Sequence, residues 1–113
     1  MEQCIFCNII SGKSPADIEF QDEDVIAFRD IDPKAPVHIL VVPKKHVASI
    51  ENVSPETDAL IGKIVRTARD LARKQGLSDN GYRLVFNVGR HSGQIVNHIH
   101  LHILGGQNLG TMV

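Results

Sequence analysis

The sequence predicts a single α+β domain: an antiparallel meander sheet of about five strands, with one long helix on one face and a short N-terminal helix. Short segments that are rich in β-branched residues recur along the 113 residues. One longer segment instead has apolar residues at the 3.6-residue spacing of a helix. Only the link that holds this helix is long enough for a crossover, so the other neighbouring strands are expected to be antiparallel. No linker or repeat divides residues 1–113.

The N-terminal part is predicted to form the short helix and three strands. Apolar residues at helical spacing, such as Ile5, Phe6 and Ile9, predict the helix at residues 4–10. The segment 11–15 contains Gly and Pro and ends it. The strands, separated by a polar turn and by a loop with two prolines, are expected at residues 18–20, 25–29 and 38–42.

The long helix is the clearest element of the second half. Ser54 is a good N-cap, Pro55 suits the first helical position, and Gly76 suits the C-terminal stop. The apolar residues between them form one stripe that is predicted to be buried: Leu60, Ile61, Ile64, Val65, Ala68, Leu71 and Ala72. Two more strands are expected at residues 82–87 and 96–104.

The composition excludes several classes of partner. Hydrophobic residues make up 42% and charged residues 22% of the chain, and its formal net charge is −1. Without a basic excess, no nucleic-acid polymer is expected as a partner. Without a long apolar run, no membrane association is expected. Residues 1–4 lack the start of a signal peptide, so the expected location is the cytoplasm, where Cys4 and Cys7 stay reduced.

Three histidines alternate with apolar residues near the C-terminus. Since side chains along a strand alternate between faces, His98, His100 and His102 are expected to share one face, and the residues between them to pack in the core. The pattern allows three interpretations: a histidine-rich surface strand, a metal site, or nucleophilic catalysis by one imidazole with its neighbours as proton donors. A neutral imidazole suits the third role because it keeps a nucleophilic nitrogen at neutral pH.

The segment before the histidines favours catalysis at phosphorus. It contains residues whose free backbone or side-chain amides can hold an anion: Asn87, Gly89, Ser92, Gly93 and Gln94. Neutral donors beside histidines suit a phosphoryl oxyanion. The nucleotide-binding pattern with a Gly-rich loop and Lys is absent from the sequence.

The histidine pattern resembles the signature of the histidine triad (HIT) superfamily. In that signature three histidines alternate with apolar residues, as they do in residues 98–104. The segments 30–38, 42–46 and 81–83, followed by Asn87 and the pair Gly93-Gln94, are similar in order to its histidine triad nucleotide-binding branch. The resemblance covers nearly the whole chain. It implies the HIT fold, a homodimer with the long helix and the strand at 82–87 at its interface, and a purine nucleotide as the small-molecule ligand.

The resemblance also implies a mechanism and a set of site residues. His100 would attack the α-phosphorus of a purine nucleoside 5′-phosphoramidate and form a covalent nucleotidyl-histidine, which water then hydrolyses. His102 would assist proton transfer, and His38 would approach the triad from the neighbouring strand. Asn87, Gly93 and Gln94 would hold phosphate oxygens, and Asp30 the ribose hydroxyls. The resemblance also implies an apolar purine slot formed by Ile5, Phe6, Ile9, Phe28 and Ile31.

Simpler explanations exist for several of these residues. Ile5, Phe6, Ile9 and Phe28 could belong to the core. Asp30 could serve the turn before Pro33, and Asn87 could satisfy the end of a strand. The chain also departs from many relatives, which have Ser at the position of Ile95 and Tyr at the position of Asn97, and a longer C-terminal tail. These departures affect the expected leaving-group preference and not the nucleophile.

Cys4 and Cys7 form a Cys-x-x-Cys pair that allows two interpretations. Both could be small buried residues of a short helix. Alternatively, the resemblance to zinc-carrying relatives implies a structural zinc ion held by Cys4, Cys7, His46 and His98, with no cofactor needed for catalysis. Such a site would be closed and would leave His100 free.

Other functions remain open from the sequence. They are a dinucleoside polyphosphate hydrolase, a nucleotidyl transferase, a nucleotide-binding regulatory protein on the same fold, and a zinc hydrolase that uses the triad as ligands. The transferase would have Gln in place of His102, and the regulatory protein would not need His100. Chelation would abolish turnover by a zinc hydrolase, but would at most destabilise a phosphoramidase.

Overall fold

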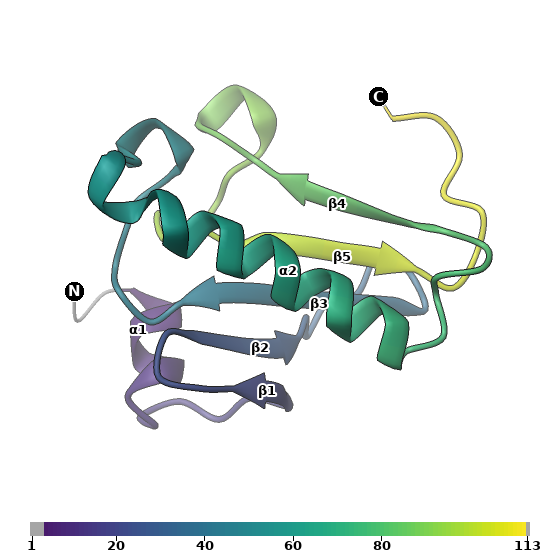
Figure 1. Ribbon diagram of the computed structural model, residues 1–113, viewed down its shortest axis with the longest axis horizontal. Coiled ribbons are helices and arrows are strands. Elements are labelled where there is room, and N and C mark those ends of the chain that lie inside the picture. Colours follow the sequence, from purple (N-terminus) through teal and green to yellow (C-terminus); the bar gives the residue numbers. More distant parts are fainter. Residues whose placement is uncertain (1–3, 113) are drawn as a thin grey trace.

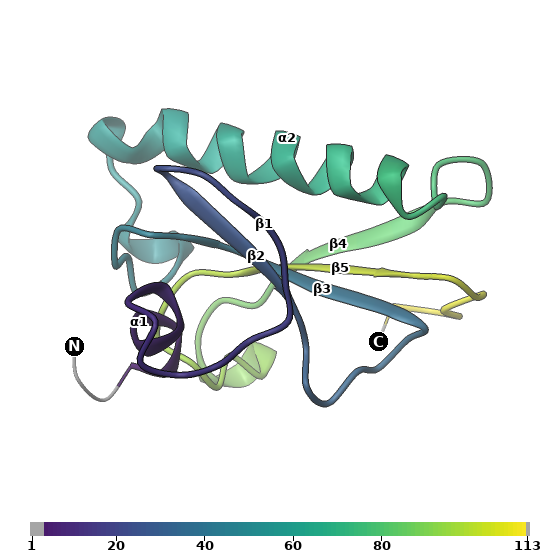
Figure 2. The same cartoon turned by 90° about the horizontal axis from the view of Figure 1, so that it is seen from below.

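The protein forms one five-stranded antiparallel sheet with α2 on one face and α1 on the other (Figures 1 and 2). The structure, a computed structural model, describes residues 4–112. Residues 1–3, which bear on the expected absence of a signal peptide, and Val113 lie outside the described residues. The elements in chain order are α1 (Ile5–Ile10), β1 (Ile18–Gln21), β2 (Val25–Arg29), β3 (Val37–Pro43), α2 (Asp58–Lys74), β4 (Tyr82–Phe86) and β5 (Leu101–Gly105).

The predicted fold class is confirmed, but the strand order is not that of a continuous meander. The sheet order is β1-β2-β3-β5-β4. The connection through α2 carries the chain past the position next to β3, so β4 becomes the edge, and β5 returns antiparallel between them. The alternately buried β5 occupies the inner position, whereas no residue of β4 is fully buried. The lengths of the connections between strands were therefore not sufficient to predict which strands pair.

The last strand is shorter than predicted at its N-terminal end. It begins at Leu101, so His98 and His100 precede it. The backbone N–H of Ile99, in the segment before the strand, donates to the carbonyl of Val47 at 2.6 Å. The side chains nevertheless alternate as predicted, because the His100 ring contacts the rings of both Phe6 and His102, whereas Leu101 and Ile103 pack in the core.

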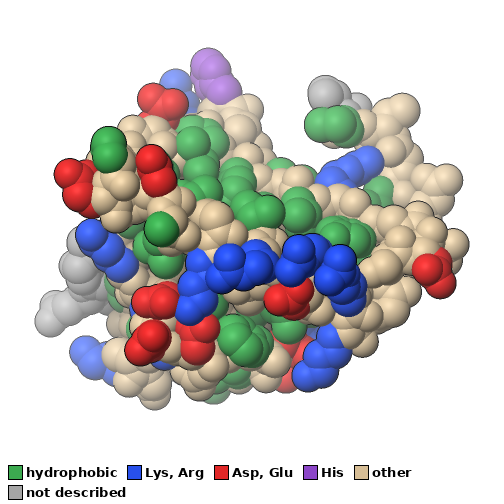
Figure 3. Space-filling model, viewed as in Figure 1, with side chains coloured by type: hydrophobic (Ala, Val, Ile, Leu, Met, Phe, Trp, Pro, Cys, Tyr) green, Lys and Arg blue, Asp and Glu red, His purple; other side chains and the backbone are tan. Residues whose placement is uncertain are grey.

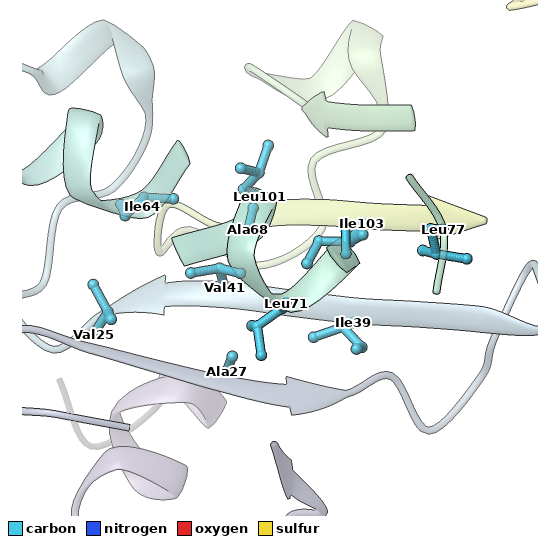
Figure 4. Packing of buried hydrophobic residues seen from close by; sticks show 11 residues of the cluster. Val25, Ala27, Ile39, Val41, Ile64, Ala68, Leu71, Leu77, Leu101 and Ile103 are labelled. Carbon is cyan, nitrogen blue, oxygen red and sulfur yellow. The ribbon is translucent and has the colours of Figure 1, made fainter. Parts of the chain in front are cut away.

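The two sheet faces are packed against different helices. Odd-numbered residues of the strands and one face of α2 form the larger cluster, which includes Ile39, Ile64 and Ile103 (Figure 4). Even-numbered residues of β2 and β3 form the second cluster with Phe6 of α1. Ile64, Ala68, Leu71 and Ala72 of the predicted stripe are buried, but Val65 is 41% exposed and points away from the core.

Local signals explain where α2 begins and ends. A 3₁₀ turn at Pro55–Thr57 precedes it, and the backbone N–H of Ser54 donates to the Thr57 hydroxyl at 3.0 Å. Gly76 follows the helix with a φ of +76°, a conformation that favours glycine. Among the helices of residues 4–112, none combines the length and the apolar character needed to cross a bilayer.

Gly106→Ala is expected to destabilise the fold more than Gly12→Ala. Both glycines have positive φ, +93° and +83°, which costs an alanine roughly 1–2 kcal/mol. A Cβ at Gly106 would also lie 2.9 Å from Cβ of Pro36, whereas one at Gly12 would meet nothing within 4 Å. Overpacking against a rigid ring adds about 1–3 kcal/mol. Urea unfolding measures the difference, and equal midpoints for the two variants would contradict it.

Candidate active site and metal centre

A pocket of about 600 Å³ opens on the sheet face opposite α2, since its lining strand residues point away from the cluster that packs under α2. Its floor is formed by residues of β3, β4 and β5 and by the histidines near β5. Its walls come from α1, from the loop between β2 and β3, and from the loop between β4 and β5. The lining residues are Ile5, Phe6, Asp30, Ile31, Asp32, Lys34, His38, Leu40, Val85, Asn87, Gly93, Ile95, Val96, His100, His102 and Leu104.

The hydrogen bonds of His100 leave one ring nitrogen available for attack. Its Nδ1 lies 2.7 Å from the backbone carbonyl of His98, which can only accept, so Nδ1 carries the proton. Nε2 then has the free lone pair. The ring is only 8% exposed, and burial lowers the pKa of His100 below its usual value. Its neutral, nucleophilic form is therefore favoured at neutral pH.

His102 and His38 are linked in a chain that ends at Asp30. The backbone N–H of Lys34 donates to Nδ1 of His38 at 3.0 Å, so the proton of His38 is on Nε2. That Nε2–H donates to Nδ1 of His102 at 2.9 Å and lies 3.4 Å from a carboxylate oxygen of Asp30. The proton of His102 is consequently on Nε2.

This chain does not fit a metal ion, although its three side chains lie within metal-binding distance of one another. A metal ligand must offer a lone pair. The Lys34 N–H takes the Nδ1 lone pair of His38, and Nε2 carries the proton. The donor set therefore suits proton transfer rather than coordination.

The Nε2 atom of His102 is buried and has no hydrogen-bond partner. A buried N–H without a partner is costly, which suggests that a ligand atom satisfies it. Burial, and then the neighbouring His100 and His38, lower the pKa of His102 to about 4. An anion bound in the pocket would oppose these effects by favouring the protonated form.

Most residues predicted for the nucleotide line this pocket, but three do not. Asn87, Gly93, Asp30, Ile5, Phe6 and Ile31 line it. Phe28 lies in the second core cluster, and Ile9 packs against that cluster. Gln94 uses its side chain within the loop: Nε2 donates to the carbonyls of Ala48 and Val96, and Oε1 accepts from Gly89. It therefore holds the loop in place, and its amide is not free for a phosphate.

His98 belongs to a second site next to the pocket. Its Nε2–H donates to the carbonyl of Pro43 at 2.8 Å, so Nδ1 has the lone pair. This Nδ1 lies 3.4 Å from Sγ of Cys4, 3.5 Å from Sγ of Cys7 and 3.1 Å from Nδ1 of His46. Nδ1 of His46 is 3.3 Å from Sγ of Cys7. We call these four residues the Cys2His2 cluster.

The Cys2His2 cluster fits a tetrahedral zinc ion. Zn–N bonds of about 2.0–2.1 Å and Zn–S bonds of about 2.3 Å place tetrahedral ligand atoms roughly 3.3–3.8 Å apart. The distances observed are within about 0.2 Å of this range, the tolerance expected for a metal site. All four potential ligands are protein side chains, so the site would be closed. The cluster also ties α1 to the segment before β5.

The Cys2His2 cluster and the pocket share a wall. Phe6 of α1 makes edge contacts with both His98 and His100, with ring centroids 6.0 and 5.0 Å apart. The two sites also meet at His98, whose ring belongs to the cluster and whose carbonyl orients His100.

Comparisons with known proteins agree with this arrangement. The family model described as "Scavenger mRNA decapping enzyme C-term binding" matches residues 3–112. A purine nucleoside phosphoramidase of Escherichia coli K12 is 45% identical over 112 residues, which cover 99% of this chain and 94% of that protein. The chain belongs to the histidine triad superfamily, in its nucleotide-binding branch.

Solved structures show the same fold. A HIT family hydrolase from Legionella pneumophila is 50% identical with a TM-score of 0.93, and the match covers 95% of this chain and 96% of that one. A zinc-bound histidine triad family protein from Mycobacterium smegmatis is 32% identical with a TM-score of 0.81, covering 99% of this chain and 81% of that one.

Some pocket residues of this HIT protein were missed from the sequence. Lys34 contributes its backbone N–H, which sets the tautomer of His38. Any residue other than proline could supply that N–H, so no side-chain signal points to it. Val85 and Leu104 form part of the floor. The sequence pattern predicts only that these two residues belong to strands.

The buried histidines are expected to make the fold sensitive to acid. The folded pKa of His102 is about 4, below the value of about 6.5 in an unfolded chain. Between these values the unfolded state binds more protons. The stabilisation is therefore complete above pH 6.5 and is lost as the pH falls towards 4. His102→Asn keeps an acceptor for His38 but does not titrate. Between pH 7 and pH 5, the urea midpoint should fall less for this variant than for wild type. An equal fall in both proteins would contradict the assignment of the low pKa to His102.

Proposed function

We propose that the protein hydrolyses purine nucleoside 5′-phosphoramidates through a covalent nucleotidyl-histidine intermediate. The observation that carries this proposal is the pair of tautomers in the pocket. His100 presents a lone pair on Nε2, and His102 presents a buried, unpartnered N–H on Nε2. A nucleophile beside a proton donor is what displacement of an amine from phosphorus requires. The name of the Escherichia coli relative supports the same reaction.

The reaction has two steps. In the first, Nε2 of His100 bonds to the α-phosphorus, the P–N bond to the amine breaks, and the amine nitrogen takes a proton from His102. In the second, water supplies a hydroxyl group to phosphorus, its proton returns to His102, and the bond to His100 breaks. His102 begins the cycle protonated, because the phosphoryl anion opposes the burial that lowers the pKa of the free imidazole. The added proton is on Nδ1 of His102, so the Nε2–H of His38 then donates to the carboxylate oxygen of Asp30, which lies 3.4 Å away.

The other lining residues divide between the nucleoside and the phosphate. Ile5, Phe6 and Ile31 offer an apolar surface for the base, and the carboxylate of Asp30 has lone pairs left for the ribose hydroxyls. The amide of Asn87 and the backbone of Gly93 lie where they can contact phosphate oxygens. His38 holds the tautomer of His102. No metal ion is needed for these steps.

Mass spectrometry of enzyme quenched during turnover of adenosine 5′-phosphoramidate tests the proposal. The expected result is a mass increase of one adenylyl group, carried by the peptide that contains His100. Turnover without an adduct, lost on chelation, would instead indicate a zinc hydrolase. Turnover of dinucleoside polyphosphates in preference to phosphoramidates would favour the related hydrolase activity.

The Cys2His2 cluster holds a structural zinc ion in this proposal. When bound, zinc supplies a cross-link between α1 and the segment before β5. Cys4 and Cys7 contribute thiolates, and His46 and His98 contribute Nδ1. The zinc-bound relative from Mycobacterium smegmatis supports the choice of metal. Reduced thiols are consistent with a cytoplasmic location.

The proposal includes a homodimer formed through α2 and β4. The face in Figure 3 carries apolar side chains over β4 and along one side of α2, where Leu84 is 36% and Val65 is 41% exposed. β4 is an edge strand, and an unpaired edge can extend into a partner. Sedimentation equilibrium should give a dimer mass for wild type and a monomer mass for Leu84→Lys. A monomeric wild type would refute this part.

A further inference from the structure

Three large apolar side chains are exposed at the catalytic pocket. Ile31 is 94%, Ile95 is 91% and Ile5 is 48% exposed, and all three line the pocket. A single exposed isoleucine needs no explanation. Three around one pocket indicate an apolar surface that a ligand covers. The purine slot accounts for Ile5 and Ile31, but it leaves Ile95 without a role.

Ile95 lies on a different wall from the residues expected to bind the nucleoside. Asp30 and Ile31 belong to the loop between β2 and β3, whereas Ile95 belongs to the loop between β4 and β5. Figure 2 shows these loops below the sheet and towards opposite ends of it. The pocket lining therefore extends from the residues expected to bind the nucleoside to the loop that carries Ile95.

The two walls also differ in charge. The wall with Ile31 carries Asp30, Asp32 and Lys34, and the last two form an ion pair of 2.7 Å. The lining residues of the wall with Ile95 carry no charge: Asn87, Gly93, Ile95 and Val96. Arg90 and His91 belong to the same loop but do not line the pocket. A charged substituent on this side would find no counterion among the lining residues.

The chemistry places the leaving amine near this wall. The attacking and leaving atoms lie roughly in line across phosphorus. Since Nε2 of His100 attacks from the floor, the amine must point towards the mouth of the pocket. The ribose is held at Asp30, so the substituent of the amine has the uncharged wall beside it.

We propose that Ile95 determines leaving-group specificity, so that the preferred substrates are phosphoramidates of alkyl- or arylamines. The inference rests on the proposed phosphoramidase function and adds the class of amine. The substituent covers Ile95 and Val96 and gains the free energy of burying apolar surface. An amine with a second, cationic group loses hydration and gains no ion pair.

The test compares two substrates on matched variants. They are the adenosine 5′-phosphoramidates of 2-phenylethylamine and of ammonia, and kcat/KM reports the steps up to P–N cleavage. Each variant is compared with wild type on the same substrate, so the intrinsic reactivity of each amine cancels. For Ile95→Ala, kcat/KM should fall roughly 10-fold on the phenylethyl substrate, the size of effect that a few apolar groups give. On the unsubstituted substrate, kcat/KM of Ile95→Ala should stay within about 2-fold of the wild-type value.

Two further variants make the result specific. Ile18→Ala removes an exposed isoleucine from β1, outside the pocket, and should leave kcat/KM unchanged for both substrates. Ile95→Asp should raise kcat/KM for a 2-aminoethyl phosphoramidate relative to the phenylethyl one, because it supplies the missing counterion. Equal loss on both substrates, or none, in Ile95→Ala would overturn the inference. Failure of wild type to turn over even the unsubstituted substrate would refute the phosphoramidase function itself.

Discussion

His100→Asn is expected to lower kcat/KM for adenosine 5′-phosphoramidate by roughly 10⁴-fold or more, the loss expected when a nucleophile is removed. The asparagine amide can still donate to the carbonyl of His98, the bond that Nδ1 of His100 makes at 2.7 Å. What it lacks is the lone pair that Nε2 directs into the pocket. The variant therefore removes the reacting atom and keeps the local structure.

Binding and covalent labelling separate this effect from a loss of the site. The variant should bind adenosine monophosphate within a few-fold of wild type, because the remaining pocket residues are unchanged. It should form no adenylyl adduct. His91→Asn is the matched control, since His91 is exposed and does not line the pocket. Activity above about one per cent of wild type in His100→Asn would exclude His100 as the nucleophile.

His100 could be proposed as the nucleophile from the sequence, but its tautomer could not be predicted. Alternation along residues 98–102 indicated that the histidines act together. It did not indicate that His98 turns into a second cluster while His100 lines the pocket. Around these histidines, the backbone N–H of Ile99 bonds to the carbonyl of Val47 and the ring of His98 bonds to the carbonyl of Pro43, both far away in the sequence. Such bonds leave no trace in side-chain type.

Loop residues were predicted less well than strand residues for the same reason. Gln94 was expected to donate to a phosphate, because an amide after glycine suits an anion. In the structure, its side-chain amide instead donates to the carbonyls of Ala48 and Val96 and accepts from the backbone N–H of Gly89. Ile95 was noted only as a departure from relatives. Its exposure at the pocket mouth depends on the path of the loop around Gly93, whose φ of +91° is a conformation favoured by glycine.

The spacing of Cys4 and Cys7 was more informative, because both lie on one turn at the start of α1. Cys4 is its N-cap, and its Sγ accepts from the backbone N–H of Cys7 at 3.4 Å. The two thiols therefore point to the same side of the helix. The two histidines came from the resemblance alone, and the structure brings them to the same place.

Cys4→Ser is expected to lose the metal and much of the heat stability, while catalysis largely survives. Serine is itself a good N-cap, so the start of α1 is kept and only the thiolate is lost. Loss of a structural zinc ion is expected to cost roughly 3 kcal/mol or more. For a domain of this size, that lowers Tm by about 10–20 °C. Elemental analysis should give one zinc per chain for wild type and none for the variant.

The activity of the same variant distinguishes a structural metal from a catalytic one. His98 keeps its hydrogen bond to Pro43, and its carbonyl still holds Nδ1 of His100. At a temperature where the variant stays folded, kcat/KM should therefore remain within about 10-fold of wild type, because no transition-state contact is removed. A strong chelator should lower the Tm of wild type and leave that of Cys4→Ser unchanged. If Cys4→Ser instead lost as much activity as His100→Asn while still folded, the metal would belong to the reaction, and the two sites that meet at His98 would be one.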